Sequence, residues 1–131
     1  MSSTESFSYY NNLEKKSTSE LLQIINNEDK KVALVIEESL ELISDLIDNI
    51  YMNMKSGGRL FYIGSGTPGR LGVVDASECP PTFGVDNNVI IGLIAGGDSA
   101  IRNSIEGAED DTIKAWEDLK KYQITKEDSV I

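Results

Sequence analysis

The segment Arg59-Leu60-Phe61-Tyr62-Ile63-Gly64-Ser65-Gly66-Thr67-Pro68-Gly69-Arg70 joins an apolar run to a glycine-rich turn. The run is short and rich in residues that favour strands, so it predicts a buried strand that ends at the glycines. Thr67 is expected to cap a following helix, with Pro68 at the first helical position, where a missing N–H is not needed. A strand, a glycine turn and a helix start in this order are typical of a site that holds an anion on backbone N–H groups.

The composition excludes several classes of partner and chemistry. The 131 residues suffice for one domain, and a net charge of −10 argues against a nucleic-acid partner, because few basic residues could replace the counterions of a phosphate backbone. No apolar run reaches membrane-spanning length and the polar start is no signal peptide, so no membrane partner is expected. One cysteine and no histidine predict a cytoplasmic protein without a histidine-bound metal, in which carboxylates, Lys, Tyr or Cys must carry any acid–base chemistry.

The first part of the chain is expected to be helical after a flexible arm. Residues 1–16 show no periodicity and predict the N-terminal arm, and residues 17–56 predict an N-terminal helical segment. Ser17-Thr18-Ser19-Glu20 is a capping box that opens a short helix, which Asn26-Asn27 is expected to end. Apolar residues at three- and four-residue spacing then predict one long helix over residues 28–55.

Residues 57–131 are expected to form part of an α/β domain. The expected elements after the glycine turn are a helix from Pro68 that Pro80-Pro81 must end, a strand over 89–94, a helix after Asp98 that reaches Ile105, a helix over 108–122 and the start of a strand at 129. Ile113, Trp116 and Cys79 are expected to be buried. Strands that alternate with helices predict a parallel sheet.

The glycine turn leaves more than one ligand class open. Residues 64–69 fit the dinucleotide pattern G-x-G-x-x-G, but Gly84 stands where an acidic residue should follow about twenty residues later. No Gly-Lys-Ser or Gly-Lys-Thr supports a nucleotide-triphosphate loop. The remaining interpretations are a site for a smaller anion such as a sugar phosphate, and a tight turn that binds nothing.

Four ordered motifs resemble the N-acetylmuramic acid 6-phosphate etherases, a family in the sugar isomerase (SIS) domain superfamily. They are Gly64-Ser65-Gly66-Thr67-Pro68-Gly69-Arg70-Leu71-Gly72, Asp75-Ala76-Ser77-Glu78-Cys79-Pro80-Pro81-Thr82-Phe83-Gly84, Gly92-Leu93-Ile94-Ala95-Gly96-Gly97 and Glu106-Gly107-Ala108-Glu109-Asp110. The resemblance covers about residues 12–131. The glucokinase regulatory protein is a weaker match, because it shares the glycine motifs but lacks the Glu-Cys-Pro-Pro motif.

The resemblance implies a SIS-type parallel sheet flanked by helices in a homodimer, with sites near the subunit interface. It also implies a carbon–oxygen lyase of cell-wall sugar recycling. The implied reaction removes the lactyl ether of N-acetylmuramic acid 6-phosphate by elimination and hydration, and gives N-acetylglucosamine 6-phosphate and D-lactate without a metal or other cofactor. The alternative is a non-catalytic sugar-phosphate-binding regulator that resembles the glucokinase regulatory protein.

The same resemblance assigns site residues. Glu78 and Asp110 match the family's two acid–base carboxylates, and Gly66, Thr67 and Arg70 are expected to contact the substrate. Elimination needs a base for the proton beside the aldehyde and an acid for the departing oxygen, but the sequence does not say which carboxylate does which. Without the motifs, either carboxylate would be read as ordinary surface charge.

Two departures from the family affect these expectations. Pro68 replaces a serine of the family's glycine loop, which removes a hydroxyl and an N–H and predicts weaker ligand binding. Family members are more than twice as long as this chain and carry a second, Ser-Gly-Arg-Thr-type phosphate loop in the additional sequence. The expectation is therefore an incomplete sheet and a chain that is inactive by itself.

Overall fold

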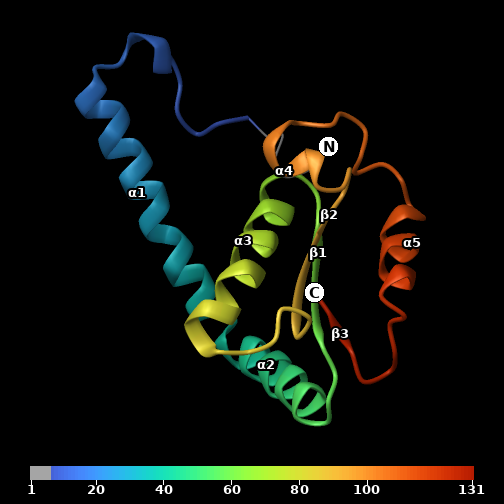
Figure 1. Cartoon of the computed structure of the whole chain (residues 1–131). Coiled ribbons are helices and arrows are strands. Elements are labelled where there is room, and N and C mark those ends of the chain that lie inside the picture. The colour runs from blue at the N-terminus through green and yellow to red at the C-terminus, as the bar shows by residue number, and fades with distance from the viewer. Residues whose placement is uncertain (1–6) are drawn as a thin grey trace. The chain divides into compact units, whose positions relative to one another are not determined.

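A computed structural model describes residues 7–131, and the chain separates into two compact units, one that ends at Ser44 and one over Asp45–Ile131. The elements in chain order are a 3₁₀ turn Leu13–Lys15, α1 Thr18–Glu37, α2 Leu40–Lys55, β1 Leu60–Gly64, α3 Gly66–Phe83, β2 Ile90–Ile94, α4 Ser99–Arg102, α5 Lys114–Lys121 and β3 Ser129–Val130 (Figure 1). The first six residues of the predicted arm lie outside the described part. No described helix combines the length and the apolar character that crossing a membrane requires.

The start of α1 confirms the predicted capping box. The Ser17 hydroxyl accepts a hydrogen bond from the Glu20 N–H, and the Glu20 carboxylate accepts one from the Ser17 N–H at 2.8 Å. The predicted break at Asn26-Asn27 is wrong, because α1 continues to Glu37. The Gln23 amide donates to the Asn27 side chain one turn later at 2.9 Å, and such a pair supports a helix at this position.

The interruption lies instead between α1 and α2, so the predicted single helix over residues 28–55 is also wrong. The Ser39 N–H donates to the Ile36 carbonyl, and the Ser39 carbonyl accepts from the Ile43 N–H, which starts α2. Two glycines follow the end of α2: Gly57 has φ +94°, its N–H donates to the Met54 carbonyl, and the Gly58 N–H donates to the Asn53 carbonyl. This pair of bonds satisfies two carbonyls that the end of α2 would leave without partners.

The strands form a parallel sheet in the order β2-β1-β3, which confirms the predicted α/β fold with a parallel sheet. Leu60 of β1 pairs with Ile90 of β2 on one side and with Ser129 of β3 on the other. Phe61, in the centre of the sheet, is fully buried and forms a small core with Ile91 and Leu119. The carboxyl ends of β1 and β2 consequently lie side by side, where open parallel sheets bind ligands.

Helix α3 differs from the prediction at both ends. Its N-cap is Ser65 and not Thr67, so Pro68 is the third residue of the helix, still within the turn whose N–H groups have no helical partner. Pro80-Pro81 do not end it, since α3 continues to Phe83 and stops at Gly84, which has φ +68° and donates its N–H to the Pro80 carbonyl. Both prolines fall in or beside the last turn, and the packing of α3 on β1 and β2 outweighs the hydrogen bonds that they remove.

The predicted helix over 108–122 is shorter than expected. The Asp111 carboxylate accepts hydrogen bonds from the N–H groups of Ile113 and Lys114, both at 3.0 Å, so α5 begins only at Lys114. Ile113 and Trp116 are 62% and 55% exposed, and the prediction that they are buried is wrong. Helix α4 likewise stops at Arg102, short of Ile105. Cys79 is buried, as predicted.

Candidate ligand site at the glycine turn

The turn after β1 and the turn after β2 are joined by the backbone. The Ala95 N–H donates to the Gly64 carbonyl at 2.9 Å, which holds the two carboxyl-terminal turns of the sheet together. Gly66, at the start of α3, has φ +54°, and the Cβ of a residue at Gly69 would lie 2.7 Å from the Gly64 carbonyl oxygen. Glycines at these two positions let the chain reverse sharply and pack closely.

A cavity of about 230 Å³ opens beside this turn. Its walls come from the glycine turn, α3, the turn after β2, α4 and the loop before α5: Ser65, Gly66, Arg70, Ala95, Ala100, Ser104, Ile105, Ala108 and Glu109. A second cavity of about 230 Å³ shares Ser65, Ala95, Ala108 and Glu109 and extends towards α5. Two of the predicted substrate-contact residues, Gly66 and Arg70, therefore lie on one cavity.

Arg70 is half-buried in the wall of the cavity. Its Nε–H donates to the Ile101 carbonyl at 2.9 Å and its Nη2–H donates to the Ala100 carbonyl at 2.8 Å. Among the described residues, no carboxylate lies within 4.0 Å of its guanidinium, although the chain carries a net charge of −10. Both of these donors therefore bind backbone carbonyl oxygens and not a carboxylate. An unpaired cation in a polar cavity is suited to an anionic ligand.

The first turn of α3 offers fewer backbone donors than most helix starts. Gly66 and Thr67 present N–H groups that have no partner within the helix, whereas Pro68 has none to present. Gly66 and Thr67 are exposed to solvent. The turn can thus contribute two backbone N–H groups beside the Arg70 guanidinium.

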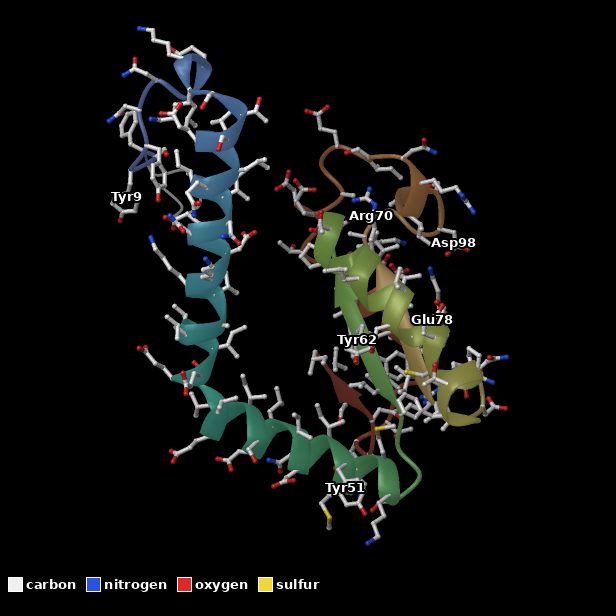
Figure 2. The ribbon with its side chains drawn as sticks, turned by 90° about the vertical axis from the view of Figure 1, so that its left-hand side faces the viewer. Tyr9, Tyr51, Tyr62, Arg70, Glu78 and Asp98 are labelled. Atoms are coloured by element: carbon white, nitrogen blue, oxygen red, sulfur yellow. The ribbon has the colours of Figure 1, made fainter. Side chains whose placement is uncertain are left out.

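The two predicted catalytic carboxylates lie in different places. Glu78 is exposed on α3, twelve residues after Gly66, and a rise of 1.5 Å per residue puts it about 18 Å further along the helix axis. Figure 2 shows Arg70 beside the α4 segment and Glu78 well along α3 from it. Asp110 is exposed in the loop before α5, directly after the cavity-lining Glu109. Within this chain Glu78 is remote from the cavity, and Asp110 lies next to its wall.

Glu109 is the carboxylate that the sequence reasoning missed. It lines both cavities beside Ser65, whereas Asp110 lines neither. The signal was present, since the two acids are adjacent in one motif, but only the loop geometry shows which of them faces the cavity. Among residues 7–131, no group of three or more Cys, Asp or Glu is arranged to hold a metal ion.

A further polar pair lies on the α3 face of β1. Burial raises the pKa of Tyr62 to about 12, and the neighbouring Asp75 carboxylate adds to the shift. Tyr62 and Asp75 line a hollow that Leu71 and Ile131 also border. Burial, together with the negative charge of Asp75, also raises the pKa of the Cys79 thiol, which makes it a poor nucleophile at neutral pH.

A glycine turn, a helix start and a cavity at the carboxyl ends of parallel strands define an α/β domain of the ligand-binding type. Comparison with protein families specifies it further: residues 42–131 match the family described as the glucokinase regulatory protein N-terminal SIS domain. The chain belongs to this SIS domain family.

The curated relatives carry one name. The chain is 56% identical to N-acetylmuramic acid 6-phosphate etherase of Christiangramia forsetii over 98% of its own length and 47% of the relative. It is 54% identical to the enzyme of that name from Bacteroides fragilis, over 98% of this chain and 46% of the relative. It is 52% identical to the enzyme of that name from Porphyromonas gingivalis, over 98% of this chain and 47% of the relative. The chain thus spans just under half the length of these relatives.

Proposed function

We propose that this chain contributes the glycine-turn half of an N-acetylmuramic acid 6-phosphate etherase. The enzyme would remove the lactyl ether by elimination and hydration, and give N-acetylglucosamine 6-phosphate and D-lactate in the cytoplasmic recycling of cell-wall sugars. The identity of 52–56% to relatives of that name supports the substrate. The observation that carries the proposal is the cavity at the glycine turn, in whose wall Arg70 has no carboxylate partner among the described residues.

The proposed binding mode uses the donors beside that cavity. The sugar phosphate, which carries negative charge, lies against the N–H groups of Gly66 and Thr67 and near the Arg70 guanidinium. Pro68 offers no N–H, so we expect weaker binding than a serine at that position would give. The loop before α5 supplies the Glu109 carboxylate to the wall of the cavity, and Asp110 follows it directly in the chain.

The proposed acid–base pair is Glu78 and Asp110. The elimination requires one group to take the proton beside the aldehyde and another to protonate the lactyl oxygen, and two carboxylates in different surroundings can do both. Because Glu78 lies about 18 Å along α3 from Gly66, it does not reach the cavity of its own chain. We propose a homodimer in which Glu78 of one copy faces the cavity of the other; the exposure of Leu71 and Val74 on the same helix, 64% and 56%, supports an interface there.

A second candidate is a sugar-phosphate-binding regulator without catalysis. It is favoured by one finding, that the matching family is described from the glucokinase regulatory protein. The two candidates share the ligand class and the cavity. They differ in whether the carboxylates convert the ligand.

The test combines a binding measurement on this chain with a turnover measurement on the chain joined to the remaining half of the Christiangramia forsetii relative, because the chain by itself is expected to be inactive. N-acetylmuramic acid 6-phosphate is titrated while NMR amide signals of the glycine turn are followed, and D-lactate release is measured with lactate dehydrogenase. For the etherase, Glu78→Gln and Asp110→Asn are expected to abolish lactate release and to retain binding, while the matched control Glu41→Gln on α2 changes neither. Binding without release in the joined protein would favour the regulator, and the absence of binding by this chain would refute a sugar-phosphate site in it.

A further inference from the structure

The end of α4 is held by a side chain from another helix. Helix α4 has four residues, so its last carbonyl groups have no later helical N–H to accept from. Arg70 of α3 donates to two of them, Ala100 at 2.8 Å and Ile101 at 2.9 Å. Ala100 is only 4% exposed, and its carbonyl would lose a charge-assisted bond if the guanidinium were removed.

The segment held in this way begins with two residues in a demanding conformation. Gly96 and Gly97 have φ +87° and +68°, so the chain reverses immediately after β2 and enters α4. A Cβ at Gly96 would lie 2.9 Å from the Ile105 side chain and 3.0 Å from the Ala100 side chain. Ile105 and Ala100 therefore both lie against the Gly96 turn, and the loop that carries Glu109 directly follows Ile105.

We propose that Arg70 is a positioning residue for the cavity. Through the carbonyls of Ala100 and Ile101 it holds α4 beside the glycine turn, and because Ala100 and Ile105 meet at the Gly96 turn, it sets where the loop with Glu109 borders the cavity. We call the two hydrogen bonds from Arg70 to the carbonyls of Ala100 and Ile101 the clamp, and its existence does not depend on the proposed function. Only its importance for ligand binding rests on the proposed function.

The clamp requires the geometry of arginine and not merely its charge. The guanidinium presents Nε–H and Nη2–H as a rigid fork, which matches two successive carbonyl oxygens. Lysine keeps the positive charge but ends in a single nitrogen on a flexible stem. Arg70→Lys thus separates the clamp from the electrostatic attraction of an anion, and Arg70→Gln removes both.

The decisive experiment is hydrogen–deuterium exchange of the full chain without ligand. We expect peptides within residues 96–110 to exchange about tenfold faster in both Arg70→Lys and Arg70→Gln, because each loses charge-assisted bonds, while β1 keeps its protection. Arg102→Lys is the matched control, since Arg102 is exposed on α4, and it is expected to behave as the unmodified chain. Unchanged exchange in Arg70→Lys would overturn the proposal, and so would an equal acceleration throughout the sheet, which would indicate a general structural role.

Titration with N-acetylglucosamine 6-phosphate provides the second readout. Positioning predicts that Arg70→Lys weakens binding about tenfold while the dependence on salt concentration stays the same, because the charge is retained. Binding within threefold of the unmodified chain would show that the charge alone matters and would overturn the positioning role. If the unmodified chain binds no sugar phosphate, the proposed function fails, and the exchange experiment still decides whether the clamp exists.

Discussion

Asp128 is the residue whose removal we expect to destabilise the sheet most clearly. Its side chain is 2% exposed and accepts five hydrogen bonds: from the N–H, Nε–H and Nη2–H of Arg59 and from the N–H and hydroxyl of Thr125. Arg59 immediately precedes β1, and Asp128 immediately precedes β3. One carboxylate thus joins the starts of two neighbouring strands.

We expect Asp128→Ala to lower the free energy of unfolding by about 2–3 kcal/mol at pH 7. Loss of one partner from a buried pair costs about 3–5 kcal/mol, but Arg59 is 26% exposed and water can replace part of what it loses. Asp128→Asn keeps the volume and one acceptor oxygen, so a loss of about 1–2 kcal/mol is expected. Glu127→Gln, at the neighbouring half-buried position, is the matched control and should change the free energy by less than about 0.5 kcal/mol.

The pH dependence supplies an independent check. Hydrogen bonds from Arg59 hold the pKa of Asp128 well below its usual range, so its stabilising contribution is present above the pKa of the unfolded chain, about 4, and is lost as the pH falls towards the folded value. A protonated Asp128 resembles asparagine. The difference between the unmodified chain and Asp128→Asn should therefore narrow below about pH 4.

Urea unfolding measures both effects, and it should be followed through the NMR amide signals of β1, because the chain contains two compact units and a bulk signal would mix them. An Asp128→Ala chain within 0.5 kcal/mol of the unmodified one at pH 7 would refute the reasoning. The reasoning would also be refuted if the difference in the free energy of unfolding between the unmodified chain and Asp128→Asn became larger on acidification.

Three further perturbations test the packing, the titration and the helix cap. Gly92→Ala is expected to lower the melting temperature and cost about 1–3 kcal/mol or more, since its Cβ would lie 2.6 Å from the Val73 Cα in α3. Tyr62 should ionise near pH 12 in ultraviolet titration, because burial and Asp75 favour the neutral phenol. The contribution of this shift to the free energy of unfolding is present below the pKa of the unfolded chain, about 10, and is lost as the pH rises through 12. Ser17→Ala should cost α1 about 1 kcal/mol and reduce helicity in circular dichroism.

Each of these has a matched comparison. Lys120→Ala changes an exposed position on α5 and should leave the melting temperature unchanged. If Gly92→Ala has the same melting temperature as Lys120→Ala, the close packing at Gly92 is contradicted. Tyr62→Phe should remove the transition near pH 12, whereas Tyr9→Phe, at a side chain that is 95% exposed, should leave that transition in place. Ser19→Ala lies inside α1, where alanine favours the helix, and a loss of helicity as large as that of Ser17→Ala would argue against the capping box.

The strands could be predicted from the sequence because their signals are local. The apolar run before Gly64 and the one before Ala95 are short, rich in β-formers and bounded by glycines, and both form strands of the parallel sheet. The helix boundaries were harder to predict from the sequence. Pro80-Pro81 lie inside α3 because contacts with β1 and β2 outweigh local preference, and those contacts involve residues distant in the sequence.

The sequence predicted where the candidate cavity lies, but it did not predict every residue that lines the cavity. The glycine turn placed Gly66 and Arg70 on a common cavity, as expected for residues four positions apart at a helix start. Which of Glu109 and Asp110 faces that cavity depends on a loop that Asp111 and Ile105 hold in place, and no periodicity reports it. The separation of Glu78 from the turn follows from helix geometry once α3 is known to be continuous.

The central position of β1 in the sheet also affects the order in which the sheet assembles. Leu60 must find Ile90 across one helix, whereas its partner Ser129 is more than twice as far along the chain. Closing the longer loop has the higher entropic cost, and the pairing that it allows involves only two strand residues of β3. We expect β1, α3 and β2 to form the folding nucleus and β3 to add last, so that β3 is the first strand to open when the native state is strained.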